Sequence, residues 1–255
     1  MKYIYFFIFA IIIVVYFGAI IYLYVTQEDK IFNRKWAKPY EPINAKKIYF
    51  TTNDGMKLEG AITVNKKNAP LVLYFSGNAN NVIEFLDNIA IKIKNYNFIG
   101  FNYPGYANSQ GKPCEQCILK YALEIYDKYK PDIIIGRSLG SAVAAYVAKN
   151  RKIKKLVLLT PFDSIVNIAK AKYPFLPIDK LVKYKFKEYE WIKNADVPVN
   201  ILLVKNDDII PTSSTKRLLK NIKHLNKIIE IDNIKHGFIY EYPNINKIIE
   251  KLLKS

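Results

Sequence analysis

Short apolar runs alternate with longer amphipathic segments along the chain after residue 45. Runs of this length predict buried strands, at 48–52, 58–64, 71–75, 98–102, 133–135, 156–160, 200–204 and 228–231. Helical spacing is found between them, at 82–94, 117–129, 139–149, 212–225 and 245–254. The alternation predicts an α/β fold with a mostly parallel central sheet and helices on both faces. Asn53-Asp54-Gly55 predicts an antiparallel hairpin at its start.

Residues 3–25 form an apolar segment without a charge or a side-chain amide. As a helix this segment is about 35 Å long, against a bilayer hydrocarbon core of about 30 Å. Four tyrosines lie near its ends, where aromatic rings favour the membrane interface: Tyr3, Tyr5, Tyr22 and Tyr24. The segment is longer than the apolar part of a secretory signal and lacks a small-residue cleavage site. We predict a single-pass transmembrane anchor over residues 1–25; the alternatives are a cleaved signal and a buried helix.

The distribution of charged residues predicts the orientation of the apolar segment in the membrane and argues against a nucleic-acid partner. Lys2 precedes the apolar segment, whereas Lys30, Arg34, Lys35 and Lys38 follow it, which predicts a cytoplasmic domain. The net charge is +17, yet only four of the 39 basic residues are arginine. Specific nucleic-acid recognition relies on arginine's planar fork, so we expect no nucleic-acid partner. An AT-rich coding sequence explains the lysines, and attraction to an anionic membrane surface is the alternative.

The remaining chain divides into three expected parts. Residues 26–45 are charged and contain Pro39 and Pro42, which predicts a linker. Residues 46–255 form the α/β domain. Within it, residues 161–197 interrupt the alternation and predict a short cap insertion above the carboxyl ends of the strands.

Cysteine and histidine are scarce, with two of each. We see no cluster of metal ligands that would support a zinc site and expect no metal. Cys114 and Cys117 have the spacing of a redox motif, but we expect two free cysteines at the start of a helix.

The segment Ile133 through Ala142 carries the strongest chemical signal. A strand leads into Gly136-Arg137-Ser138-Leu139-Gly140, and a helix rich in alanine follows. This context predicts a nucleophile elbow, a tight turn that presents Ser138 above the sheet. The alternative is a serine in an ordinary strand–helix turn.

A serine nucleophile requires a base, and a base requires an orienting carboxylate. His236 follows the last predicted strand, whereas His224 lies in a lysine-rich helix and is expected at the surface. Asp207, after the strand at 200–204, is the predicted acid; Asp208 and Asp163 are the alternatives. The order serine, aspartate, histidine is typical of α/β-hydrolases.

The oxyanion of the reaction requires two backbone N–H donors. The amide of Leu139, directly after the nucleophile, is the first. The turn Ser76 through Asn80 follows the strand at 71–75, and we assign the second donor to Asn78. The alternative is a plain Asn/Gly-rich loop.

Together these motifs resemble the α/β-hydrolase superfamily. A narrower resemblance is to its membrane-anchored branch, related to alpha/beta-hydrolase domain-containing proteins 13 and 17 and their bacterial homologues. It covers residues 46–255 and the anchor. Residues 73–81 are similar to the family's L-Y-F-H-G-N-A-G-N, and residues 102–111 to its Y-R-G-Y-G-x-S-x-G; Pro174-Phe175-Leu176-Pro177 and Asp207 through Pro211 match later blocks.

This resemblance implies an α/β-hydrolase fold and a Ser138–His236–Asp207 triad without a cofactor. The chain departs from the family pattern at four positions: Ser76 replaces histidine, Pro104 replaces arginine, and Asn80 and Ala107 replace glycines.

We therefore expect a membrane-anchored serine hydrolase acting on a carboxylic ester or thioester of a small-molecule or lipid acyl substrate. The alternatives are a peptidase or lipid acyl hydrolase with the same triad, and a non-catalytic binding protein on a hydrolase scaffold.

Overall fold

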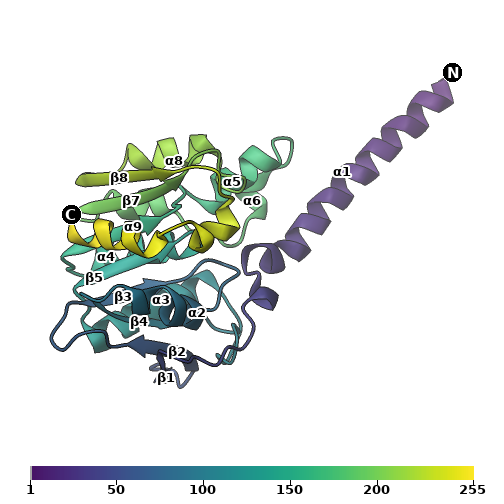
Figure 1. Cartoon of the computed structure of the whole chain (residues 1–255). Helices are drawn as coiled ribbons and strands as arrows, with labels where there is room; N and C mark the ends of the chain where they lie inside the picture. The colour runs from purple at the N-terminus through teal and green to yellow at the C-terminus, as the bar shows by residue number, and fades with distance from the viewer. Residues whose placement is uncertain (1) are drawn as a thin grey trace.

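One eight-stranded sheet forms the centre of the computed structural model, which describes residues 2–255 (Figure 1). Its strand order is β1-β2-β4-β3-β5-β6-β7-β8. The bounds are β1 Lys46–Thr51, β2 Lys57–Thr63, β3 Leu71–Phe75, β4 Asn97–Phe101, β5 Ile133–Arg137, β6 Lys155–Leu159, β7 Val199–Val204 and β8 Leu225–Ile231. β3 to β8 pair in parallel, while β2 pairs antiparallel with β1 and β4. The predicted hairpin is therefore present, with Gly55 at φ +84° in its turn.

Helices cover both faces of the sheet, as the unbroken apolar strands predicted. The bounds in the domain are α2 Val82–Asn88, α3 Glu115–Tyr129, α4 Leu139–Asn150, α8 Thr212–Leu219 and α9 Ile245–Lys254, with short 3-10 turns at Ala90–Lys92 and His236–Glu241. Adjacent residues of β5 point to opposite faces: Ile134 packs in the core formed with α3, α4 and α8, and Ile135 in the core formed with α2 and α9.

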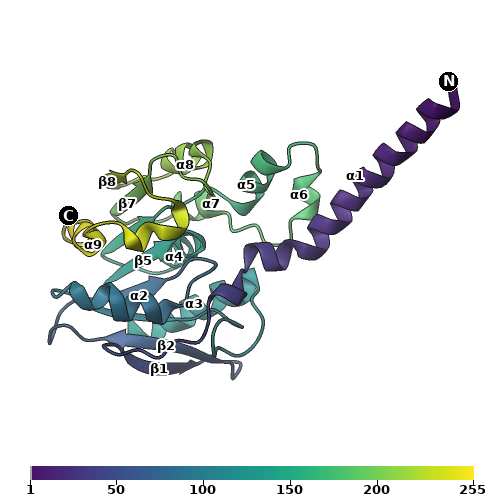
Figure 2. The same ribbon diagram turned by 45° about the vertical axis from the view of Figure 1, so that its right-hand side comes forward.

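The N-terminal helix α1, Lys2–Ile31, projects away from the domain (Figures 1 and 2). Among the described residues it is the one helix long and apolar enough to cross a membrane. The helix continues past residue 25, because no proline interrupts the chain before Pro39. Phe32 and Ala37 are then buried in the domain core. The part of the expected linker that contains Phe32 and Ala37 is thus packed against the domain.

The cap insertion contains three short helices, α5 Ile165–Lys172, α6 Ile178–Leu181 and α7 Glu188–Ile192. It follows β6 and so begins at the carboxyl edge of the parallel strands. Phe162 and Phe186 are fully buried in the core below it. Phe175, in contrast, is exposed between α5 and α6. Residues 165–186 are called the α5–α6 hairpin below.

Cys114 and Cys117 form a disulfide, so the expectation of two free cysteines is wrong. Cys114 is the residue that caps α3, and the first helical turn returns the chain toward it. Their Cα atoms are 5.2 Å apart, within the range that a disulfide can bridge.

Candidate active site

Ser138 occupies the turn between β5 and α4 with backbone angles φ 49° and ψ −118°. Such a conformation is uncommon for a side-chain-bearing residue and is held only by its surroundings. The two flanking glycines explain how it forms. A Cβ atom on Gly136 would collide with the carbonyl oxygen of Gly140, and one on Gly140 with the carbonyl of Phe75. The turn has the geometry of the predicted elbow and leaves Ser138 half-buried, accessible at the carboxyl end of β5.

A continuous chain of hydrogen bonds joins the three residues predicted as a triad. The Nε2 atom of His236 lies 2.9 Å from Ser138 Oγ. Its Nδ1 atom lies 2.7 Å from Asp207 Oδ2. The residues come from three separate loops, after β5, β7 and β8, at one edge of the sheet. Because His236 is only 6% exposed, its ring is held between these partners and excluded from bulk water.

Asp207 is ionised by its surroundings. Burial opposes the charged form, but the hydrogen bond from His236 and the backbone amides of Ile210 and Ile209 outweigh it and hold the pKa of Asp207 below its usual range. Both amides lie 2.8 Å from Oδ1, which leaves Oδ2 for the imidazole. The carboxylate can therefore orient the ring and stabilise an imidazolium.

The residues kept as alternatives have other partners. Asp208 Oδ1 accepts a hydrogen bond of 2.9 Å from the backbone N–H of His236, so it holds the loop and not the ring. Asp163 is fully buried and pairs with Arg217. His224 lies at the surface, 2.8 Å from Asp196.

The turn Ser76 through Asn80 lies directly beside the nucleophile. A Cβ atom on Gly77 would stand 3.7 Å from the Ser138 Cβ. Two tyrosines of the loop after β4 hold this turn: Tyr103 donates to the Ser76 carbonyl at 2.8 Å, and Tyr106 to the Asn78 carbonyl at 2.9 Å. With its carbonyls bound on that side, the turn can present amides toward the site, as can Leu139 at the start of α4.

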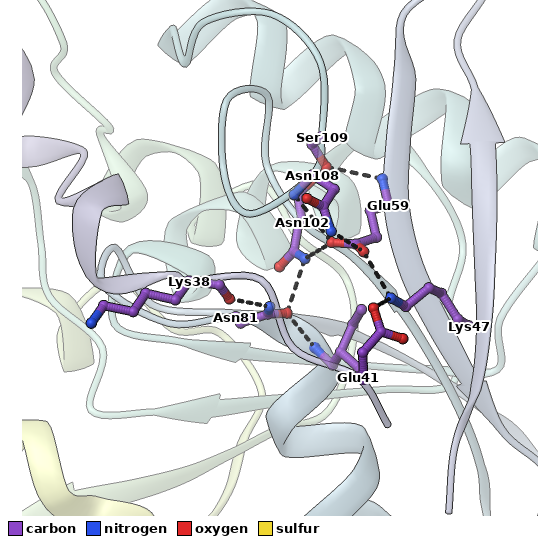
Figure 3. Close-up of polar contacts among 9 residues, drawn as sticks. Lys38, Glu41, Lys47, Glu59, Asn81, Asn102, Asn108 and Ser109 are labelled. Atoms are coloured by element: carbon purple, nitrogen blue, oxygen red, sulfur yellow. Dashed lines mark hydrogen bonds and ion pairs between the residues drawn. The ribbon is translucent and has the colours of Figure 1, made fainter. Parts of the chain in front are cut away.

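A second polar cluster fixes the same turn from behind (Figure 3). Glu59 of β2 is fully buried and accepts a hydrogen bond of 2.8 Å from the Asn108 side chain. Asn102 donates to Glu59 at 3.4 Å and to Asn81 at 2.9 Å. Asn81 caps α2 directly after the turn. The cluster thus ties the loops after β3 and β4 together.

Arg137, between Gly136 and the nucleophile, was missed by sequence reasoning. Its side chain is buried and reaches two loops at once. Nη2 donates to the carbonyls of His236, at 2.9 Å, and Gly237, at 3.1 Å, while Nη1 donates to the Asn80 side chain. Position x of a Gly-x-Ser-x-Gly motif is variable, so no local signal marked it.

Glu188 was also missed, and it lies behind the elbow. The Ser141 hydroxyl is 2.7 Å from Glu188 Oε2 and 2.6 Å from the Ser138 carbonyl oxygen. One hydroxyl hydrogen can serve only one of these acceptors. Burial raises the pKa of Glu188 well above its usual range, so the neutral acid can donate to Ser141, which then donates to Ser138. The acid comes from α7 of the cap, which no sequence motif linked to the elbow.

No group of three or more potential metal ligands occurs among the described residues, 2–255. Ala107, which replaces a glycine of the family pattern, has φ +47°, a conformation that favours glycine.

The sheet order is that of the α/β-hydrolase fold. An esterase of Pyrococcus furiosus superposes with a TM-score of 0.62 at 18% identity, over 85% of this chain and 97% of that one. The thioesterase domain from the curacin biosynthetic pathway gives 0.62 at 12% identity, over 83% and 99%. The predicted fold is thereby confirmed.

Among similar sequences, one is named for the same fold. The alpha/beta hydrolase domain-containing protein WAV2 of Arabidopsis thaliana is 29% identical over 198 residues, which cover 67% of this chain and 64% of WAV2. The lysophosphatidylserine lipase ABHD12 of Rattus norvegicus is 25% identical over 240 residues, 78% of this chain and 59% of the lipase. An uncharacterized membrane protein of Saccharomyces cerevisiae is 26% identical over 206 residues, 75% and 71%. No protein-family model matches the chain. The narrower resemblance to the 13 and 17 branch stays a prediction.

Proposed function

We propose that the protein is a membrane-anchored serine hydrolase that cleaves carboxylic ester or thioester bonds. The observation that carries this proposal is the hydrogen-bonded series Ser138 Oγ, His236 and Asp207 at a strained strand–helix turn. A serine, a base and an orienting carboxylate in this geometry are the parts required for acyl transfer.

In the proposed mechanism, Ser138 Oγ attacks the acyl carbon as His236 Nε2 takes its proton. The amides of Leu139 and Asn78 bind the oxyanion, and each donor of this kind is worth about 10²–10³ in rate. His236 then protonates the leaving alcohol or thiol, and the acyl group remains on Ser138. Water attacks the acyl-enzyme, again with His236 as base, and releases the acid. Asp207 stays ionised throughout and stabilises the imidazolium.

The substrate class rests on similarity and on the anchor. Sequence relatives include a lysophosphatidylserine lipase, and structural relatives include an esterase and a thioesterase domain. An apolar N-terminal helix would keep the site beside a bilayer. We therefore infer a lipid or lipid-like acyl substrate, consistent with the membrane-anchored branch related to proteins 13 and 17. A peptidase is the competing reaction, since the triad alone does not choose the leaving group.

We propose that α1 crosses the membrane as a single-pass anchor and that the domain lies in the cytoplasm. The basic residues after the helix favour this orientation. The Cys114–Cys117 disulfide is a feature more typical of oxidising compartments and favours the opposite orientation, which is the alternative outcome of a protease test. Protection of the domain from protease in sealed, right-side-out cells would support the cytoplasmic side, and cleavage there would overturn it.

Labelling by a fluorophosphonate probe tests the hydrolase proposal. The parent chain should label, and Ser138→Ala should not. The matched control is Ser213→Ala, an exposed serine on α8, which should label like the parent. Equal labelling of Ser138→Ala and the parent would exclude Ser138 as nucleophile, and an unlabelled parent would favour a non-catalytic binding protein. A panel of esters, thioesters and amides of graded acyl length then identifies the leaving group.

A further inference from the structure

The end of α1 is joined to the α5–α6 hairpin by specific contacts. The side-chain oxygen of Gln27 accepts a hydrogen bond of 2.8 Å from the backbone of Lys183. Its nitrogen donates to the Leu181 carbonyl at 3.2 Å. Beyond the helix, Phe32 packs edge-on against Tyr184 with 4.8 Å between ring centres. Two bonds to hairpin backbone and a buried aromatic contact hold the helix and the hairpin in one orientation.

These contacts extend into the apolar part of α1. Ile20, Leu23 and Gln27 lie on one helical face and are half-buried, whereas Ile21 is 62% and Val25 70% exposed. α6 is in contact with α1, and both views show it and the loop before it alongside the helix (Figures 1 and 2). Since Ile20 and Leu23 belong to the predicted membrane span, the hairpin reaches the depth at which that span leaves the bilayer.

The tip of the hairpin presents a rigid apolar wedge. Pro174 and Pro177 restrict the backbone on both sides of Phe175, and the N–H of Leu176 closes a turn onto the Tyr173 carbonyl at 3.2 Å. Phe175 is 88% exposed, and it is the one large apolar side chain of the hairpin that is exposed. No neighbouring part of the described chain covers it.

The hairpin that carries this tip has an excess of positive charge. The hairpin carries one acidic residue, Asp179, and five lysines: Lys170, Lys172, Lys180, Lys183 and Lys185. An exposed apolar tip on a lysine-rich segment is typical of a segment that lies in the interface of an anionic membrane. Lys183 also stands 4.0 Å from the ring centre of Tyr24, at the end of the apolar span.

We propose that the α5–α6 hairpin is a second membrane contact, with Phe175 inserted into the interface of an anionic bilayer and the lysines on its headgroups. This proposal rests on the membrane anchor of the proposed function and goes beyond it, because a single anchor helix, even one joined firmly to the domain, can tilt in the bilayer and does not by itself bring a surface of the domain onto the headgroups.

With two contacts, the carboxyl edge of the sheet faces the bilayer. The same edge holds the site: Ala107 donates to the Ala37 carbonyl at 3.0 Å, and its neighbour Tyr106 donates to Asn78 of the turn beside Ser138. The segment that follows the anchor is therefore connected to the turn beside the nucleophile.

An environment-sensitive fluorophore tests the contact. The full chain carrying Phe175→Cys, labelled with a nitrobenzoxadiazole dye, is reconstituted in vesicles of phosphatidylcholine and phosphatidylserine. The matched control is Val64→Cys, a residue 66% exposed at the opposite end of the sheet. The parent chain, treated with the same dye, gives the background from Cys114 and Cys117. Lipids with a quencher on the acyl chain then report contact with the hydrocarbon region.

The dye at position 175 should emit at shorter wavelength than at 64 and lose at least half of its emission to the lipid quencher, with weaker quenching in phosphatidylcholine alone. Equal emission and quenching at 175 and 64 would overturn the contact, and equal quenching in neutral and anionic vesicles would overturn its anionic partner. The measurement requires no turnover. If the parent chain failed to react with the fluorophosphonate probe, the hydrolase proposal would be wrong, but the proposed membrane contact of the hairpin would be unaffected. If the dye at position 175 were not quenched in a chain that reacts with the probe, the membrane contact would be wrong while the hydrolase proposal stood.

Discussion

Arg137 donates a hydrogen bond of 2.9 Å to the backbone carbonyl of His236, the residue whose ring faces Ser138. Its other amino group binds the side chain of Asn80, at the end of the turn beside the nucleophile. The guanidinium also lies 4.8 Å from the ring centre of Tyr240. One buried side chain thus joins the histidine loop to the turn that would bind the oxyanion.

Arg137→Lys should lower kcat about 10²-fold with a small change in KM, because misplacing catalytic groups by about 1 Å has an effect of this order. Lysine keeps the charge but cannot reach two loops with a planar fork. Steady-state kinetics on a short soluble ester measures kcat and KM separately. Arg151→Lys is the matched control, since Arg151 pairs with Asp127 at the surface. A parental kcat for Arg137→Lys would remove its positioning role.

Asp207→Asn and Asp208→Asn should separate the two adjacent carboxylates. Asn at 207 can present an N–H to the ring and favour the wrong tautomer, which cost about 10⁴ in kcat in another serine hydrolase triad. Asn at 208 keeps an oxygen for the His236 backbone N–H, so its effect should be far smaller. Rates of ester hydrolysis rank the two variants. The reverse ranking would make Asp208 the acid.

Activity should fall as the pH decreases through the range in which histidine protonates, which is about 6.5 for the free side chain. A protonated imidazole cannot accept the serine proton. The pKa of Asp207 is held below its usual range, so this carboxylate remains ionised there and does not produce the fall. The pH profile of kcat/KM measures it. A rate that stays constant down to about pH 5 would argue against a histidine base.

Glu188→Gln should raise the free energy of unfolding more at pH 8 than at pH 5. The pKa of Glu188 is raised by burial, so between its unfolded and folded values the native state holds a proton that the unfolded state releases. Stability therefore decreases with rising pH in that window, and glutamine removes this dependence. Urea unfolding of the detergent-solubilised chain at both pH values measures the difference, with Glu190→Gln, half-buried on the same helix, as control. An equal effect at both pH values would contradict a neutral Glu188.

The local sequence determined the order of strands and helices and the elbow at Ser138. Apolar runs that are buried on both faces differ from amphipathic helices within a few residues, so the pattern is visible without any long-range contact. The loop positions of Asp207 and His236 followed from the same pattern, because both residues come shortly after predicted strands. Glycines at 136 and 140 marked the turn since only they fit its close approaches.

Tertiary structure alone decided what stands behind those residues. Arg137 meets the His236 loop across 99 residues of sequence, and Ser141 meets Glu188 across 47. The contact of Gln27 with Lys183 spans 156 residues and turned an expected linker into a fixed joint. Hydrogen bonds of this kind form only where the fold brings residues that are distant in sequence close together. The hydrophobic periodicity and the spacing of motifs do not contain this information. The disulfide was also decided by the folded structure. Cys-x-x-Cys spacing occurs in free, redox-active and disulfide-bonded pairs, and here the position of Cys114 at the cap of α3 sets the distance between the two cysteines.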